Sequence, residues 1–171
     1  MDLEIDIEAP WPTGEWQALA SRAAEAARHA APELANSRLS ASLLFTCDDE
    51  IHGLNRQWRG QDKATNVLSF PMLERAELLA LEREGPPELL GDVALAYETC
   101  AREAAEKSIA IEHHAAHLVI HGLLHLAGYD HEVSPQEADA MEALEVKALA
   151  LMGIADPYAG TDAAGGRSRA H

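Results

Sequence analysis

Apolar and polar residues alternate in several short stretches of the chain, and this period of two is typical of half-buried β-strands. At the start, Leu3, Ile5 and Ile7 alternate with acidic residues. Proline cannot donate a hydrogen bond to a neighbouring strand, so a stretch that ends at Pro71 belongs at a sheet edge. The pattern predicts four strands, at residues 3–7, 37–47, 67–70 and 91–97.

Segments of helical composition or periodicity separate these strands. Asp48 is expected to cap the second helix, and Ser134-Pro135 to start the last one. Short connections allow antiparallel pairing and helical crossovers allow parallel pairing, so the sheet should be mixed. The expected fold is a single compact α/β (α+β) domain with a mixed β-sheet packed with helices, whose strand order the pattern leaves open. Helices are predicted at residues 15–31, 48–58, 98–107, 111–127 and 134–153, with a partly helical excursion at 72–90.

Length and composition agree with one domain outside a membrane. The 171 residues are 47% hydrophobic, enough for one substantial core. Cys47 and Cys100 are too few for a disulfide framework and are interpreted as buried thiols in a reducing compartment. The acidic N-terminus does not resemble a signal peptide, and the uncharged stretch 113–129 is short for a membrane span. We therefore expect a cytoplasmic protein with no membrane partner.

The segment HLVIHGLLHLAGYDHE, residues 117–132, carries the strongest chemical signal. His121 and His125 lie four residues apart, so on a helix their imidazoles can converge on one zinc ion. His131 would lie roughly 15 Å further along a straight helix. Gly128 can adopt the left-handed conformation that ends a helix and turns the chain back. The three histidines then form a zinc site with an open fourth position, as in catalytic sites.

Other interpretations of these histidines must be considered. A single histidine on an apolar helix is more often a packed or hydrogen-bonded core residue, and a pair is still weak evidence. His113 and His117 extend the stripe of histidines backward. His117 could not share an ion with both His121 and His125, because the three span about 12 Å of helix. His113 and His117 are therefore interpreted as residues that support the site or line its cleft.

The histidine spacing matches the H-E-x-x-H-x-x-G-x-x-H motif of zinc proteases, with one difference. Those enzymes use the glutamate after the first histidine as the general base. Here that position is Gly122. A peptidase function is disfavoured by this, although not excluded.

Taken together, two motifs resemble the YbeY family of zinc-dependent endoribonucleases, which act in ribosomal RNA maturation. They are LNRQWRGQDKATNVLSFP at residues 54–71 and HGLLHLAGYDH at residues 121–131. Leu90-Gly91-Asp92 and Asp156-Pro157-Tyr158 extend the resemblance over most of the chain. Ala64 departs from the proline expected before Thr65. The resemblance implies a zincin-like fold. We expect a single catalytic metallohydrolase domain at residues 1–158, and the composition of the glycine-rich end predicts a disordered tail at 159–171.

The net charge of −16 opposes the binding of a polyanion at long range. Any contact with RNA must therefore use a local positive group, formed by the zinc with Arg56, Arg59 and Lys63. On their own, these three side chains would more simply be solvated loop charges. The resemblance implies a catalytic role for Arg59 only, whose guanidinium suits the negative charge of a phosphoryl transition state.

Asp130, beside the third histidine, could orient a ligand or accept a proton, or could simply be a turn residue. The general base is therefore left open.

The sequence leaves three candidate functions open. The first, implied by the resemblance, is a single-strand-specific endoribonuclease with one Zn²⁺ per chain. It would act in ribosomal RNA processing, at the three-prime end of the small-subunit RNA, and in ribosome quality control. Its partners would be single-stranded RNA or a ribosomal RNA precursor and the ribosome or its associated proteins, with no DNA. The second is a zinc metallohydrolase of another substrate, such as a peptidase, and the third is a non-enzymatic, zinc-stapled ribosome-associated factor.

Overall fold

A four-stranded mixed sheet forms the centre of the computed structural model, which describes residues 1–130 and 134–159. The strands are ordered β1-β2-β4-β3. β1 pairs with β2, and β2 with β4, in parallel, whereas β3 runs antiparallel to β4. The mixed sheet and the edge position of the Pro71 strand are thus confirmed. The strands span Asp2–Ile7 (β1), Leu39–Thr46 (β2), Val67–Pro71 (β3) and Glu88–Ala96 (β4).

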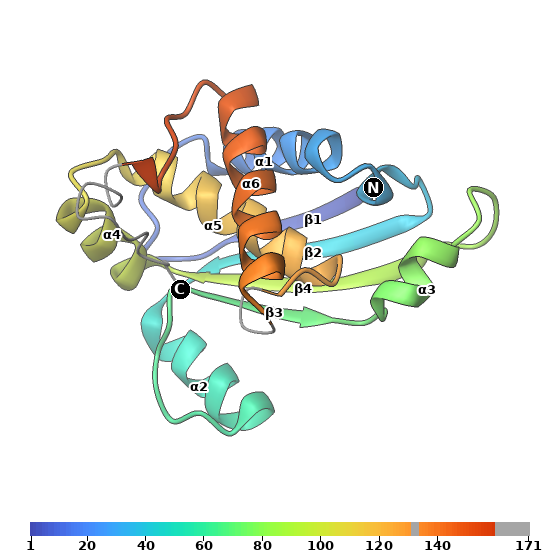
Figure 1. Cartoon of the computed structure of the whole chain (residues 1–171). Coiled ribbons are helices and arrows are strands. Elements are labelled where there is room, and N and C mark those ends of the chain that lie inside the picture. The colour runs from blue at the N-terminus through green and yellow to red at the C-terminus, as the bar shows by residue number, and fades with distance from the viewer. Residues whose placement is uncertain (131–133, 160–171) are drawn as a thin grey trace.

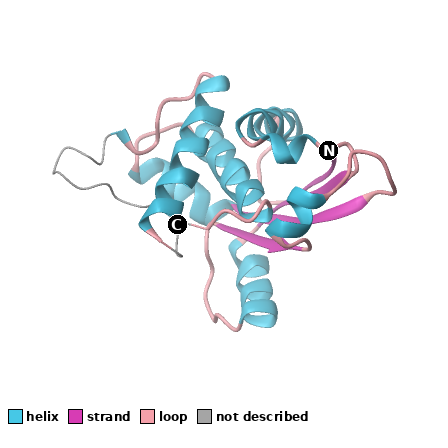
Figure 2. Ribbon diagram, turned by 45° about the vertical axis from the view of Figure 1, so that its right-hand side comes forward, coloured by secondary structure: helices cyan, strands magenta, loops and turns pink. Residues whose placement is uncertain are grey.

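The helices cover the two faces of the sheet unequally. Figure 1 shows α1, α5 and α6 above the sheet and α2 alone projecting below it, and Figure 2 shows the same arrangement from the side. No described helix is both long and apolar enough to cross a membrane. The helices are α1 (Trp16–Ala30), η1 (Pro32–Ala35), α2 (Asp48–Arg59), α3 (Arg75–Ala80), α4 (Tyr97–Glu106), α5 (Ile111–Leu126) and α6 (Pro135–Leu151).

Two sequence-based expectations about local structure were wrong. β4 begins at Glu88, three residues before the predicted start at position 91, because the strand continues through an irregularity in the β2–β4 register between Leu89 and Gly91. A side chain at Gly91 would lie 2.4 Å from the carbonyl oxygen of Phe70, and its φ is +150°. Asp48 does not cap α2: the cap residue is Cys47, and the Asp48 carboxylate instead accepts hydrogen bonds from the backbone and hydroxyl of Thr99.

Helix α5 lies against the sheet at Gly122. A Cβ at this position would be 2.6 Å from Cγ1 of Val93 on β4, far inside normal contact. The absence of a side chain therefore lets the helix approach the sheet closely. The apolar residues of α5 and of β4 around this contact belong to the main core, which fills the space between the sheet and helices α1, α5 and α6. A smaller apolar cluster, below the sheet, packs α2 against β3 and β4 through Ile51, Leu68, Ala94 and Ala96.

Candidate active site

His121 and His125 lie one turn apart near the end of α5, as the sequence predicts. Their ring centres are 4.7 Å apart with the planes at 76°. His121 is buried and His125 is half-buried, and both line a cleft of about 730 Å³. His131, the third predicted ligand, lies outside the described residues. Within residues 1–130 and 134–159, no group of three histidine, cysteine or acidic side chains could hold a metal.

The turn after α5 has the geometry that Gly128 predicts. Gly128 has a φ of +98°. The backbone amide of Tyr129 donates to the carbonyl of Leu124 at 3.1 Å, and that of Gly128 donates to the carbonyl of His125 at 2.9 Å. This pair of bonds is the Schellman arrangement that ends a helix and reverses the chain. Asp130, the next residue, lines the same cleft as the histidine pair, so the chain does return toward it.

Three side chains hold this turn in place. The Arg75 guanidinium donates to the carbonyl of Ala127 at 2.7 Å and lies 3.1 Å from the Glu33 carboxylate. Its carbon is 4.4 Å from the centre of the Tyr129 ring, a cation–π distance. The Tyr129 hydroxyl donates to Glu33 at 2.7 Å. The position of the segment after α5 is therefore fixed by α3 and η1 as well as by its own backbone.

A buried carboxylate on α6 orients His121. Oε2 of Glu145 lies 2.9 Å from Nδ1 of His121, and Oε1 lies 2.5 Å from Nε2 of His117 and 2.5 Å from the Tyr158 hydroxyl. An ionised carboxylate only accepts hydrogen bonds, so all three groups donate to it. In neutral His121 this leaves the lone pair on Nε2. A histidine held by a carboxylate through its other nitrogen is the usual state of a metal ligand.

The charge state of Glu145 follows from its donors. Burial raises the pKa of a carboxyl group, but the hydrogen bonds from His117 and His121 outweigh burial and hold the pKa of Glu145 well below its usual range. Burial also lowers the pKa of His117, which therefore remains a neutral donor. His121 therefore has a fixed negative charge beside its Nδ1 atom. This charge favours the binding of a cation at Nε2, the other ring nitrogen.

Sequence reasoning missed Glu145. The available signal was its position, because Glu145 lies four residues after Met141 and four before Leu149, both of which are buried. A carboxylate on the apolar face of a helix is costly unless it is paired. The expected supporting role fits His117, which shares Glu145 with His121. Neither expected role fits His113, which is exposed and is not among the described residues that line the cleft.

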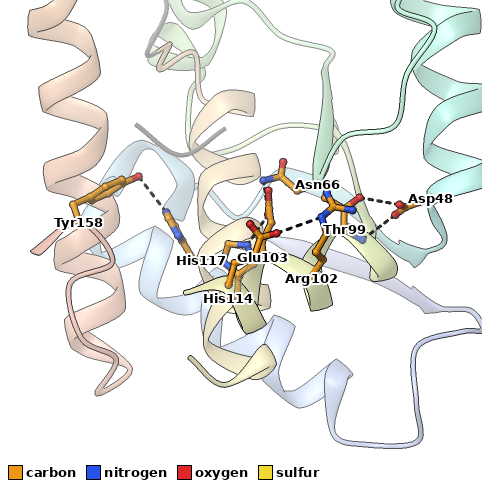
Figure 3. Close-up of polar contacts among 9 residues, drawn as sticks. Asp48, Asn66, Thr99, Arg102, Glu103, His114, His117 and Tyr158 are labelled. Carbon is orange, nitrogen blue, oxygen red and sulfur yellow. Dashed lines mark hydrogen bonds and ion pairs between the residues drawn. The ribbon is translucent and has the colours of Figure 1, made fainter. Parts of the chain in front are cut away.

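Figure 3 shows a second buried histidine with a carboxylate partner, beside Tyr158 and His117. Nε2 of His114 lies 2.8 Å from Oε1 of Glu103, and the same oxygen accepts a hydrogen bond from the Asn66 amide at 3.0 Å. Asn66 lines the cleft. This contact thus connects α4 and α5 to the cleft wall that precedes β3.

Arg59 also lines the cleft, from the end of α2. It is the last residue of α2, which ends because Gly60 adopts the left-handed conformation with a φ of +68°. The side chain of Asn55 then donates to the carbonyl of Lys63 at 2.9 Å and fixes the loop that follows. Arg59 and Lys63 both line the cleft with His121 and His125, although they are far away in sequence.

The cleft wall is poor in negative charge for so acidic a chain. The protein has 29 acidic residues, yet Asp130 is the only one among the described residues that line this cleft. Amides and hydroxyls supply most of the remaining polar surface. Arg56, by contrast, is exposed, lies 3.9 Å from Asp62 and is absent from the lining. Of the three predicted cations, two therefore face the site. The full lining is Asn55, Arg59, Gln61, Lys63, Thr65, Asn66, Val67, Ser69, Phe70, Pro71, His121, His125 and Asp130.

The comparisons with known proteins assign the chain to a class of enzyme. The family model described as "Endoribonuclease YbeY" matches residues 5–153. The chain therefore belongs to the YbeY family of endoribonucleases, hydrolases that act on RNA, and the resemblance seen in the sequence is confirmed.

Individual relatives support the same assignment. The chain is 63% identical to Endoribonuclease YbeY of Erythrobacter litoralis, over 92% of this chain and 98% of the relative. It is 60% identical to that of Novosphingobium aromaticivorans, over 94% and 97%. The solution structure of TM1509 from Thermotoga maritima superposes with a TM-score of 0.57 at 26% identity, covering 88% of this chain and 91% of that one.

We expect Glu145→Gln to weaken metal binding about 10- to 100-fold, the usual effect of removing a carboxylate behind a ligating histidine. An amide can accept from one imidazole, but its NH₂ group then faces another donor. The measurement is competition for zinc against a chromophoric chelator. Glu137→Gln, the same change at an exposed position of α6, is the matched control. An unchanged zinc affinity in folded Glu145→Gln would show that Glu145 does not position a ligand.

Proposed function

We propose that this endoribonuclease cleaves single-stranded RNA at one Zn²⁺ ion held by His121, His125 and His131. Its substrate would be a ribosomal RNA precursor, matured at the three-prime end of the small-subunit RNA, with a further role in ribosome quality control. One observation carries the proposal: the His121–His125 pair and Arg59 line the same cleft, although α5 and α2 lie on opposite faces of the sheet. The ribosome or its associated proteins are the proposed partners, in the cytoplasm.

The donor set fits zinc. Two imidazoles whose ring centres are 4.7 Å apart line the cleft, and Nδ1 of His121 faces Glu145, so Nε2 would be its ligating atom. A helix that carries a histidine pair against a sheet edge also supports a zincin-like classification of the fold. When bound, zinc would supply Lewis acidity that neutralises charge on a phosphoryl oxygen and lowers the pKa of a water molecule.

The protein's own residues would do the remaining work. Arg59 carries its positive charge into the cleft, where its planar fork can bind phosphoryl oxygens in the transition state. Lys63 adds a second cation to the same wall. Asn55 holds the loop between them, and the Glu145 carboxylate keeps His121 in one orientation. Preorganised groups of this kind need no rearrangement as charge develops.

The peptidase alternative is weakened by the packing of α5. The general base of the zinc proteases would have to stand at position 122, where even a Cβ would lie 2.6 Å from Val93. No glutamate fits there without moving the helix away from the sheet.

The proposal is tested by giving one protein sample two substrates, a single-stranded RNA and a casein-type protein, in metal-loaded and chelated forms. The metal-loaded sample should cleave the RNA, and chelation should abolish this cleavage. Neither form should hydrolyse casein. A duplex RNA of the same sequence serves as the control for strand preference and should be cut much more slowly. Casein hydrolysis without RNA cleavage would overturn the proposal.

A further inference from the structure

Trp58 is exposed in a way that its position on α2 does not predict. It follows Asn55 by three residues and Ile51 by seven, so the three share one face of the helix. Ile51 and Asn55 are buried, with exposed fractions of 0% and 2%, whereas Trp58 is 67% exposed. The reason is that α2 extends beyond the sheet it packs on, so that its last turn projects from the body of the protein (Figure 1).

Trp58 is not itself among the residues that line the cleft, but Asn55, on the same face of α2, is one of them. The next residue, Arg59, lines the cleft, and Lys63 lines it from the loop that begins at Gly60. An exposed aromatic ring close in sequence to cations that line a cleft resembles the combination that single-strand-binding proteins use, in which the cations follow the backbone while bases stack on the ring.

We propose that the indole of Trp58 is a stacking platform for one nucleobase of the RNA, next to the nucleotides held in the cleft. This inference rests on the proposed function, because it takes the cleft as the place where RNA binds. A stacked base is the occupant that fits an isolated exposed ring on the helix whose last residue, Arg59, lines the cationic cleft. A protein partner would need a larger apolar area than one side chain provides. Stacking also favours single strands, because their bases are not held in base pairs and can turn outward onto a protein side chain.

Fluorescence gives a direct test, because Trp58 is the tryptophan that RNA in solution can reach. The chain has three tryptophans, and the other two, Trp11 and Trp16, are only 6% exposed. A short single-stranded RNA added to the protein should quench the emission, and Trp58→Phe should abolish the quenching. An oligonucleotide of the same length with abasic sugars keeps the phosphates and should quench little. Equal quenching by the abasic strand, or quenching that persists in Trp58→Phe, would overturn the proposal.

Kinetics provide the second measurement. Trp58→Ala should raise KM for single-stranded RNA about tenfold, the size of one lost stack, with kcat nearly unchanged. Trp58→Phe should recover most of the loss, because a ring remains. Leu79→Ala removes an apolar side chain of similar exposure, 58%, from α3 and is the matched control. An unchanged KM in Trp58→Ala would overturn the stacking role.

The two proposals fail in distinguishable ways. If the wild-type protein cleaves RNA and Trp58→Ala has the wild-type KM, the stacking platform is wrong and the proposed function stands. If the wild-type protein is quenched by single-stranded RNA through Trp58 but cleaves none, the contact stands and the proposed function is wrong. If RNA causes neither quenching nor cleavage, both are wrong.

Discussion

Replacing His125 by alanine is expected to lower the bound zinc from one ion per chain to well below one. Two remaining ligands bind an exchangeable ion much less tightly than three. His125 is half-buried, so this variant disturbs the core less than a change at buried His121. His121→Ala and His131→Ala should lose zinc in the same way. The measurement is metal analysis of the purified, folded variants.

His113→Ala is the control for this series. His113 lies on the same helix but is exposed, so its removal should leave one zinc per chain. Because the proposed site joins α5 to the turn after it, the zinc-free variants should also unfold at lower denaturant concentration than the zinc-loaded protein. Full zinc occupancy in His131→Ala would contradict the ligand assignment.

Arg59→Glu is expected to abolish RNA cleavage while leaving the fold and the zinc content intact. Arg59 is exposed at the end of α2 and supplies no ligand, so neither property depends on it. This charge reversal places a carboxylate where the RNA phosphate would bind, in a cleft whose described lining otherwise holds one acidic residue. Arg59→Ala should be less severe. Losing one preorganised transition-state contact typically lowers kcat by about 10²- to 10³-fold. The measurement is single-turnover cleavage of single-stranded RNA at matched ionic strength.

Two further variants separate charge from geometry. Arg59→Lys should recover only part of the activity, because an ammonium group cannot form a bidentate contact. Arg56→Ala removes a cation from the same helix that is paired with Asp62 and lies outside the cleft, so it should cleave at nearly the wild-type rate. A rise in KM at unchanged kcat in Arg59→Ala would mean that Arg59 holds the substrate only. Wild-type cleavage by Arg59→Glu would contradict the proposed cleft.

Local sequence was sufficient to predict the main helices and the reversal of the chain after α5. The spacing of His121 and His125 and the left-handed requirement at Gly128 are properties of a single segment, and both expectations were confirmed. The edge position of β3 followed from one residue, Pro71. The mixed character of the sheet followed from connection lengths.

The remaining features depend on contacts between distant segments. The strand order and the early start of β4 are set by pairing with β2, which no local pattern reports. The sequence shows that Gly122 stands where the zinc proteases have their general base, but only the contact of Gly122 with Val93 shows why a side chain is excluded there. Glu145 was missed because its partners lie on another helix, 24 and 28 residues away. The predicted ligand His131 and most of the predicted tail lie outside the described residues.

The most direct test of a zinc-dependent RNA cleft is to return zinc to the chelated protein in measured equivalents while following cleavage of a single-stranded RNA. Cleavage should be absent without metal, rise in proportion to added zinc and reach its plateau at one equivalent per chain. His125→Ala, carried through the same titration, should stay near zero at one equivalent. Full RNA cleavage by the metal-free protein, or by His125→Ala at that point, would contradict the account.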